Sequence, residues 1–237
     1  MKLPFISVIV PTLNEEKLIE ACLKSIKNQD YKGKYEIIVA DGKSKDKTVE
    51  IAKNYADKVV IAEKKGIAIE RNTGARVAKG EILFFVDADT ILCFNTLSEI
   101  SKAFKKKNVV GACCPLVPLS SKARDFLIYW LYDQLAKASI KTKTPHIAGG
   151  CCAYRKDAFE KIGGFNEKLK VYEDIDLSRR ISKLGKIVFV ENTIALTSPR
   201  RIEAWGRTKA AGRYIYSYLS YLLRGKSIGY NKYKPIR

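Results

Sequence analysis

The sequence predicts an α/β protein with a Rossmann-like, mostly parallel central sheet flanked by helices, and two observations carry this prediction. First, β-branched apolar runs alternate with segments whose apolar residues recur at helical spacing, as in successive βαβ units. Second, polar residues follow each of the first four expected strands, namely Thr12, Asp41, Glu63 and Asp87. The carboxyl ends of parallel strands line one edge of a sheet, where open α/β proteins bind their ligands.

The first half of the chain holds four expected strands joined by helices. The strands are residues 6–10, 35–40, 58–62 and 81–86, where β-branched and aromatic residues concentrate. Asn14 is the expected N-cap of the first helix, with Glu15 and Glu16 as acids in its first turn. A later helix is expected to begin after Gly66 and to end at Gly80.

The second half of the chain is less regular. Its expected helices are residues 96–107, 123–137, 157–162 and 173–184, and its expected strands are residues 109–119 and 186–190. Residues 141–154 contain Pro145 and Gly149-Gly150, which favour a flexible loop leading into a strand.

The end of the chain is strongly basic. From Pro199 onward, ten Lys or Arg residues oppose one acid, Glu203, and six tyrosines are interleaved. One helical stripe in this segment contains Ile215, Leu219, Leu222 and Leu223. Such a segment suits the interface of a membrane, and it equally suits a helix that packs its apolar stripe on the domain.

Composition narrows the function classes. The net charge of +19 predicts an anionic partner, which can be nucleic acid, anionic lipid or a phosphorylated substrate. No signal peptide is visible, and the apolar stretches at 109–119 and 126–132 are too short to span a bilayer. The six cysteines lack zinc-site spacing, so buried free thiols are expected, with a disulfide between the pairs Cys113-Cys114 and Cys151-Cys152 as the alternative.

Two aspartates follow the fourth expected strand in the segment GEILFFVDADT at 80–90. Side chains at i and i+2 of a strand point to the same side, so the carboxylates of Asp87 and Asp89 are expected to lie together. Two carboxylates at a strand end can hold a divalent cation and leave positions open for phosphate oxygens. The bare motif is a weak signal, because Asp174-Ile175-Asp176 is a second copy of it.

Four segments in order resemble the family 2 glycosyltransferases: SVIVPTLNEE at 7–16, DGKSKDKT at 41–48, GIAIERNTGARVAKGEILFFVDADT at 66–90 and YEDIDLSRR at 172–180. The resemblance implies the GT-A fold, with a nucleotide-sugar-binding half at 1–110, an acceptor-binding half at 111–198 and a basic extension at 199–237. It also implies inverting transfer from a UDP- or GDP-sugar to an acceptor hydroxyl or phosphate, with Mg²⁺ or Mn²⁺ bound.

The resemblance assigns roles on the donor side of the reaction. The residues it places at the nucleotide are Pro11, Thr12, Asn14, Glu15, Asp41, Gly66, Asp87 and Ala88. Asp41 is expected to accept a hydrogen bond from the base, because a carboxylate only accepts. Arg71 is expected to offset the charge of the diphosphate. Asp87 is expected near the ribose and the metal, with Asp89 as a direct metal ligand.

On the acceptor side, the resemblance points to Asp174 of the pair Glu173-Asp174. This aspartate is the expected base that takes the proton from the acceptor hydroxyl, and its place at a helix start favours the anion. Acids in a first helical turn are the plainer interpretation of the pair. Arg200 and Arg201 are expected to close over the diphosphate. The Q-x-x-R-W signature of processive synthases is absent, which predicts non-processive transfer.

The basic extension suggests a polyprenyl phosphate or a lipid-linked glycan as acceptor. We therefore expect a cytoplasmic protein that binds peripherally to the anionic cytoplasmic face of the membrane. The competing hypothesis is a non-enzymatic nucleic-acid or anionic-lipid binding protein on the same scaffold, whose tyrosines stack on bases. It leaves the acids at the strand ends unexplained, so no nucleic-acid partner is expected. A sugar-phosphate nucleotidyltransferase would need a Gly-rich, Arg-containing loop after the first strand, and PTLNEE is not one.

Overall fold

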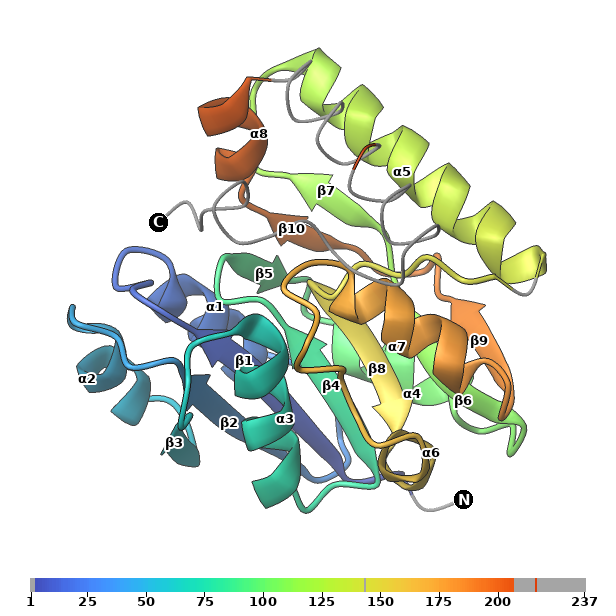
Figure 1. Cartoon of the computed structure of the whole chain (residues 1–237), viewed down its shortest axis with the longest axis horizontal. Helices are drawn as coiled ribbons and strands as arrows, with labels where there is room; N and C mark the ends of the chain where they lie inside the picture. Colours follow the sequence, from blue (N-terminus) through green and yellow to red (C-terminus); the bar gives the residue numbers. More distant parts are fainter. Residues whose placement is uncertain (1–2, 143, 207–215, 217–237) are drawn as a thin grey trace.

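The computed structural model describes residues 3–142, 144–206 and 216, and it contains a seven-stranded sheet with helices on both faces (Figure 1). The strand order is β3-β2-β1-β4-β8-β6-β9. Strand β8 pairs antiparallel with β4 and with β6, whereas the other neighbours in this sheet pair in parallel. The predicted mostly parallel sheet is therefore confirmed, with β8 as its one reversed strand.

The seven strands of the large sheet are buried on both faces except at its two edges, where they are partly exposed. They are β1 (Ile6–Thr12), β2 (Tyr35–Asp41), β3 (Lys58–Ile61), β4 (Ile82–Val86), β6 (Val109–Cys113), β8 (Cys151–Arg155) and β9 (Lys186–Phe189). Val8 of β1 enters the core on one face and Ile9 enters the core on the other. In β4, Phe84 lies in the same core as Val8, and Phe85 lies in the same core as Ile9. A parallel strand buried on both faces has a continuous apolar sequence, which is why these strands were predictable.

Three helices contribute to each core. On the face of Val8 they are α1 (Ile19–Lys27), α2 (Thr48–Lys53) and α4 (Thr96–Ala103); on the face of Ile9 they are α3 (Ile67–Val77), α6 (Lys156–Lys161) and α7 (Glu173–Ile181). Phe85 of β4 anchors the second core through Phe159 and Phe165, with ring centroids 5.5 Å and 5.0 Å away. Offset and edge-to-face pairs of this kind add to the free energy gained from burial.

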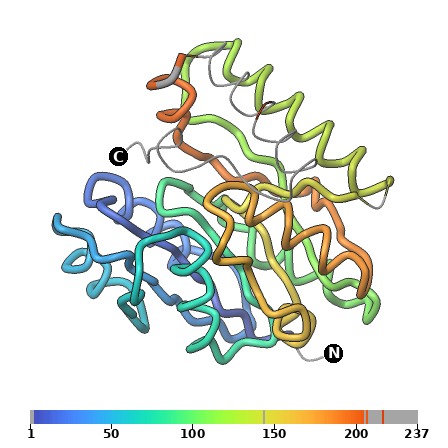
Figure 2. Tube along the Cα trace, in the orientation of Figure 1, coloured from blue at the N-terminus to red at the C-terminus, as the bar shows by residue number. Residues whose placement is uncertain are grey.

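A smaller sheet holds β5 (Thr90–Leu92), β10 (Ala195–Thr197) and β7 (Leu116–Pro118), in the order β5-β10-β7. The long helix α5 (Ala123–Lys141) packs on β7, and the short helix α8 (Arg200–Trp205) follows β10. The Cα trace in Figure 2 shows residues near 195–205 returning to lie beside residues near 90–118. The end of the described chain is thus brought back to the carboxyl end of β4.

Several expected boundaries are wrong in detail. The expected strand at 109–119 is two strands, β6 and β7, which belong to different sheets. The helices expected at 66–80, 96–107 and 173–184 end earlier, at Val77, Ala103 and Ile181. Strands β5 and β10 were not expected, because three-residue strands leave almost no periodic signal.

The first helix begins at Ile19, so Asn14 is not its N-cap. Asn14 has a left-handed backbone with φ of 55°, and Glu15 and Glu16 lie in the turn before the helix. The cause is tertiary: these residues hydrogen-bond to the segment after β2, and those contacts override the local capping signal.

The basic extension predicted at 199–237 is described only to Gly206 and at residue 216, so its apolar stripe lies outside the described residues. Among the residues that the structure describes, no helix is both long and apolar enough to cross a membrane. The six cysteines are free, as expected, and five of them are buried. The thiols of Cys114 and Cys151 lie 3.1 Å apart.

Candidate active site

The carboxyl ends of β1, β2 and β4 and the start of β8 meet at one rim of the large sheet. Because β8 runs antiparallel to β4, Cys151 pairs with Val86. The N–H of Asp87 then donates to the carbonyl of Gly150 at 3.2 Å. Residues 87–89 and 149–150 therefore adjoin, although they are far apart in the sequence.

Asp41 at the end of β2 is fully buried and already well bonded. Its carboxylate accepts the Thr12 hydroxyl at 3.0 Å and the N–H of Ser44 at 2.8 Å, together with the Ser44 hydroxyl. An ionised carboxylate offers about four acceptor positions, so three bonds leave one for a donor from a ligand. The structure shows Asp41 as the anchor of the turn before Ser44, and its contact with a base stays a prediction.

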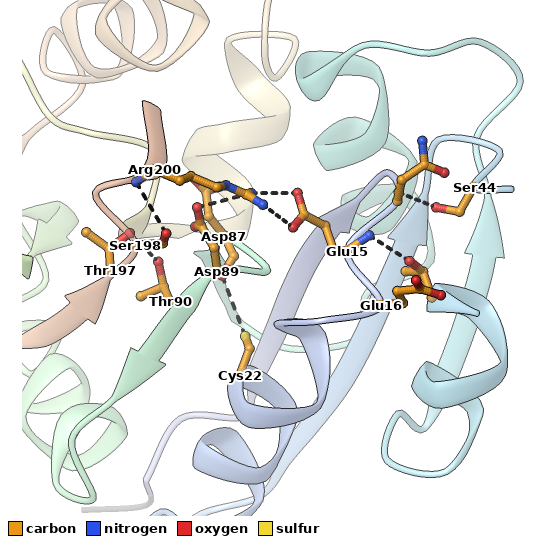
Figure 3. Close-up of polar contacts among 12 residues, drawn as sticks. Glu15, Glu16, Cys22, Ser44, Asp87, Asp89, Thr90, Thr197, Ser198 and Arg200 are labelled. Carbon is orange, nitrogen blue, oxygen red and sulfur yellow. Dashed lines mark hydrogen bonds and ion pairs between the residues drawn. The ribbon is translucent and has the colours of Figure 1, made fainter. Parts of the chain in front are cut away.

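Residues 14–16 are fastened to the segment after β2 by side-chain to backbone bonds (Figure 3). The N–H of Asn14 donates to the Ser44 hydroxyl at 2.8 Å, and its Oδ1 accepts the N–H of Lys45 at 2.8 Å. The N–H of Glu15 donates to Thr48 Oγ1 at 2.7 Å. These bonds fix the Glu15 backbone, and its carboxylate reaches the other way, toward Arg200.

Glu15, Asp89 and Arg200 form one charged cluster (Figure 3). Arg200 donates two hydrogen bonds of 2.7 Å to the Glu15 carboxylate, and its Nη2 lies 3.1 Å from Asp89 Oδ2. Burial, and then the negative charge of Asp87, raise the pKa of Asp89 to about 6, while Arg200 and Arg201 act in the opposite direction. The cluster therefore has an excess of negative charge that attracts cations.

The smaller sheet positions Arg200. Strand β10 pairs with β5, the Thr90 hydroxyl donates to Thr197 Oγ1 at 3.2 Å, and the N–H of Ser198 donates to the carbonyl of Asp89 at 3.1 Å. This brings the start of α8 to the Asp89 turn. Arg201, the next residue, is exposed.

The alternation of side chains along a strand predicted that Asp87 and Asp89 lie on one strand. In the structure they lie in the turn that follows β4 instead. Strand β4 ends at Val86, and the N–H of Thr90 closes a turn onto the carbonyl of Asp87 at 3.0 Å. The turn reverses the chain into β5, and the two carboxylates still interact. Ala88 between them is buried, as are Pro11 and Thr12 at the end of β1.

Arg71 of α3 joins the two acidic regions of the rim. It is buried, and its guanidinium contacts Asp87 Oδ1 at 2.8 Å and Glu173 Oε1 at 2.9 Å. The Phe165 ring lies on one side, with its centroid 5.3 Å from Arg71 Cζ. A Cβ on Gly149 would come within 2.3 Å of the same guanidinium, so only glycine fits there. The predicted contact of Arg71 with a diphosphate stays a prediction.

Glu173 and Asp174 begin α7, directly after Tyr172, whose φ of 67° is uncommon outside glycine. Asp174 Oδ2 accepts the N–H of Gly149 at 2.8 Å. Burial raises the pKa of Asp174, and the charge of Arg71 lowers it in part. Burial, followed by the negative charge of Asp174, raises the pKa of Glu173 to about 7. A buried carboxylate with a raised pKa is a better proton acceptor than an exposed one.

The donor set fits a cation that shares its ligands with a substrate. Within the described residues, no group of three or more His, Cys, Asp or Glu side chains could hold a metal alone. Mg²⁺ is commonly bound by one or two carboxylates together with substrate phosphates, and Asp87 and Asp89 supply two such carboxylates. The Arg200 guanidinium beside Asp89 shows that a positive charge is accommodated at this point.

Sequence reasoning missed two features of the rim. Glu15 and Arg200 are separated by 185 positions, and no local pattern pairs them. Glu70 of α3 is buried, and its Oε1 accepts the N–H of Gly66 at 3.2 Å. A Cβ on Gly42 would lie 2.0 Å from that same oxygen, so the position of Glu70 requires glycine at residue 42. The glycine of the Asp41-Gly42 pair was therefore the signal in the sequence that could have pointed to this close contact.

Comparisons with known proteins agree with this geometry. The sequence profile described as glycosyl transferase family 2 matches residues 7–163, and one described as the N-terminal domain of galactosyltransferase matches residues 131–197. A beta-monoglucosyldiacylglycerol synthase of a Nostoc species is 29% identical over 199 residues, covering 76% of this chain and 41% of the relative.

A second relative, from Methanococcus voltae, is 43% identical over 90 residues. It is named dolichyl N-acetyl-alpha-D-glucosaminyl phosphate 3-beta-D-2,3-diacetamido-2,3-dideoxy-beta-D-glucuronosyltransferase, and the match covers 35% of this chain and 27% of the relative. This chain thus spans less than half the length of either curated relative.

Among solved structures, the mannosyltransferase PcManGT from Pyrobaculum calidifontis, in complex with GDP-Man and Mn²⁺, superposes with a TM-score of 0.74. The two are 26% identical, and the match covers 95% of this chain and 66% of that one. The predicted GT-A fold is confirmed by this superposition together with the mostly parallel sheet.

Proposed function

Because the chain belongs to glycosyl transferase family 2, we propose that it transfers a sugar, with inversion, from a UDP- or GDP-sugar to a lipid or lipid-linked acceptor. Residues 1–110 would bind the donor and residues 111–198 the acceptor. The relative from Nostoc is named for a diacylglycerol product and the one from Methanococcus for a dolichyl phosphate substrate, which supports an acceptor of this class.

The observation that carries the proposal is the position of Arg71 between Asp87 and Glu173. Asp87 belongs to the turn after β4, and Glu173 lies beside Asp174 at the start of α7. One buried guanidinium therefore links Asp87, a proposed donor-side acid, to Glu173, the neighbour of the proposed base in the sequence. A substrate pair bound there would meet both groups at once.

In this mechanism Asp174 removes the proton from the acceptor hydroxyl as its oxygen attacks the anomeric carbon. Attack comes from the face opposite the departing nucleoside diphosphate, so configuration inverts and the proton ends on the Asp174 carboxylate. Its Oδ2 accepts the N–H of Gly149 and its Oδ1 accepts the N–H of Ile175, each at 2.8 Å, so both oxygens are oriented and each keeps a lone pair for the acceptor hydroxyl. A phosphate acceptor is already ionised, so its attack would not require the base.

On the donor side, Asp87 and Asp89 would hold Mg²⁺ or Mn²⁺, which when bound supplies positive charge to the leaving diphosphate. Arg200 and Arg201 are the nearby cations at the Asp89 turn that can contact the diphosphate oxygens. The rim of β1 and β2, with Thr12, Asn14 and Asp41, would receive the nucleoside. The net charge of +19 suits work at the anionic cytoplasmic face of a membrane.

A turnover assay tests this function. Purified protein is incubated with UDP- and GDP-sugars, Mn²⁺ or Mg²⁺, and a short-chain polyprenyl phosphate or diacylglycerol in detergent, and released nucleoside diphosphate is measured. We expect one donor to turn over, activity to disappear with EDTA, and Asp174→Asn to lower the rate by about 10²–10⁴-fold on a hydroxyl acceptor.

Asp176→Asn is the matched control, because Asp176 is an acid of the same helix that pairs with Arg180 instead of facing the rim. It should keep near wild-type activity. Steeply salt-dependent RNA binding without any nucleotide-sugar turnover would contradict the proposal and support the nucleic-acid alternative.

A further inference from the structure

Helix α5 has an unusual distribution of side chains. Its two acids, Asp125 and Asp133, are buried, whereas large apolar side chains lie on its outer side. Leu127 and Trp130 are each 56% exposed and Leu135 is 68% exposed; Phe126 and Leu131 are also exposed. A surface helix of a globular domain normally shows the reverse arrangement, with its apolar stripe toward the core.

The buried acids explain how α5 is held in this orientation. Asp125 accepts the Ser120 hydroxyl at 2.6 Å, and Asp133 Oδ1 accepts the N–H of Leu116 at 3.4 Å. Both partners belong to β7 or to the turn that follows it, so polar contacts fasten the inner side of the helix. These contacts fix the orientation of α5, with its apolar side facing outward.

The outer face also carries cations at both ends. Arg124 lies seven residues before Leu131, and Lys141 lies fourteen residues after Leu127, so about two and four helical turns place them on the same face. Both are exposed. At 1.5 Å per residue they are about 25 Å apart along the axis. The outer face of α5 is thus an apolar stripe bounded by positive charges, with the acids of the helix turned inward.

We propose that the outer face of α5, defined by Leu127, Trp130, Leu131, Arg124 and Lys141, lies in the interface of a membrane that contains anionic lipid. Amphipathic helices that lie in the membrane plane combine an apolar face, tryptophan at the headgroup level and flanking basic residues. The arrangement of charge favours anionic lipid over a protein partner, because basic residues beside an apolar face are attracted to an anionic lipid surface, whereas lysine is depleted at protein interfaces.

The position of α5 connects this surface to the rim. In Figure 1, α5 lies at the edge of the molecule, and β7 and β10 separate it from β5. Strand β5 begins at Thr90, directly after Asp89. Binding through α5 would hold the rim near the lipid headgroups, where a lipid acceptor would be presented. That last step rests on the proposed function, whereas binding of α5 to lipid does not.

Co-sedimentation of the full chain with vesicles tests the proposal without any substrate. The vesicles contain phosphatidylcholine alone or equal parts of phosphatidylcholine and phosphatidylglycerol. Leu127→Gln with Leu131→Gln should lower partitioning into the anionic vesicles by at least about tenfold, because two exposed leucines lose their apolar contact with lipid. Arg124→Gln with Lys141→Gln should lower it by roughly tenfold at low salt, and the loss should shrink as salt is added.

Ile61→Gln with Phe94→Gln is the matched control, since both residues are exposed and lie away from α5. It should bind vesicles like wild type. Thermal melting of every variant shows whether it is folded, and these exposed positions should leave it unchanged. Asp89→Ala separates the two proposals: it should bind vesicles normally even if donor binding is lost.

Trp130 gives a local readout. In a Trp205→Phe background, its emission should shift to shorter wavelength on anionic vesicles. No binding by wild type would overturn the proposal. So would undiminished binding by the leucine variant, which would assign the membrane contact to the C-terminal extension. A dimer that the leucine variant dissociates, without vesicle binding, would instead assign the face to a second copy of the chain.

Discussion

Two arginines neutralise the acids of the rim, and they differ in how firmly they are held. The Arg71 side chain is 2% exposed and lies among Asp87, Glu173 and the Phe165 ring. The Arg200 side chain is 25% exposed and belongs to α8, a helix of six residues near the end of the described chain. Arg71 is enclosed by the core of the domain, whereas Arg200 reaches the rim from the end of a strand.

This difference suggests different roles for the two charges. Removing one member of a buried ion pair leaves an uncompensated charge in a medium of low polarity, which is costly. A partly exposed pair such as Arg200–Glu15 is screened in part by water, so its loss is expected to cost less stability than the loss of Arg71. Arg71 is therefore expected to hold the rim together, and Arg200 to be a counterion of Asp89 that a metal can displace and that can then bind the diphosphate.

The largest expected effect is on stability. Arg71→Gln should lower the free energy of unfolding by about 3–5 kcal/mol, because Asp87 and Glu173 lose their common partner. Urea unfolding followed by circular dichroism measures this loss. Adding Glu173→Gln should restore part of it, since one unpaired charge is then removed. A loss below about 1 kcal/mol would show that Arg71 is not held more firmly than Arg200.

Removing Arg200 should have a smaller effect on stability. Its effects on the affinity for Mn²⁺ alone and on the affinity for the donor with Mn²⁺ should have opposite signs. Arg200→Gln should lower the free energy of unfolding by about 1–2 kcal/mol, less than Arg71→Gln, because Arg200 is partly exposed although its partner Glu15 is buried. It should raise the affinity for Mn²⁺ alone by several-fold, because Asp89 loses a competing cation, and lower the affinity for the donor with Mn²⁺ by roughly tenfold. Electron paramagnetic resonance of free Mn²⁺ and calorimetry measure the two affinities.

Arg201→Gln is the control for Arg200→Gln, because Arg201 is the adjacent, exposed cation. It should leave the affinity for Mn²⁺ alone within about twofold of wild type, since an exposed charge is largely screened. If Arg200→Gln weakens Mn²⁺ binding instead, Arg200 supports the metal site and does not compete with it.

The sequence predicted the donor half of the fold better than the acceptor half, and the reason is physical. Strands β1, β2 and β4 are parallel and buried on both faces, so their sequences are continuous apolar runs. Strands β5, β7 and β10 have three residues each and depend on partners distant in the chain. Their pairing is set by tertiary contacts that no local window contains.

The residues of the candidate site also differ in how well the sequence predicted them. Asp87, Asp89 and Asp174 could be predicted as candidates because each follows a recognisable element or motif; their roles stay predictions. The double hydrogen bond between Arg200 and Glu15 could not be predicted, because it forms only when β10 brings the end of the chain to the Asp89 turn. Asn14 shows the converse error, since a good capping residue was used by the Ser44 loop instead.

The proposed function divides the rim, with donor-side acids at Asp87 and Asp89 and a separate base at Asp174. Calorimetric titration with a UDP- or GDP-sugar in the presence of Mn²⁺ tests it most directly on wild type, Asp89→Ala and Asp174→Asn. We expect Asp174→Asn to bind the donor within a few-fold of wild type and Asp89→Ala to lose at least about tenfold in affinity. Equal loss in both variants, or undiminished binding by Asp89→Ala, would contradict the division of the rim.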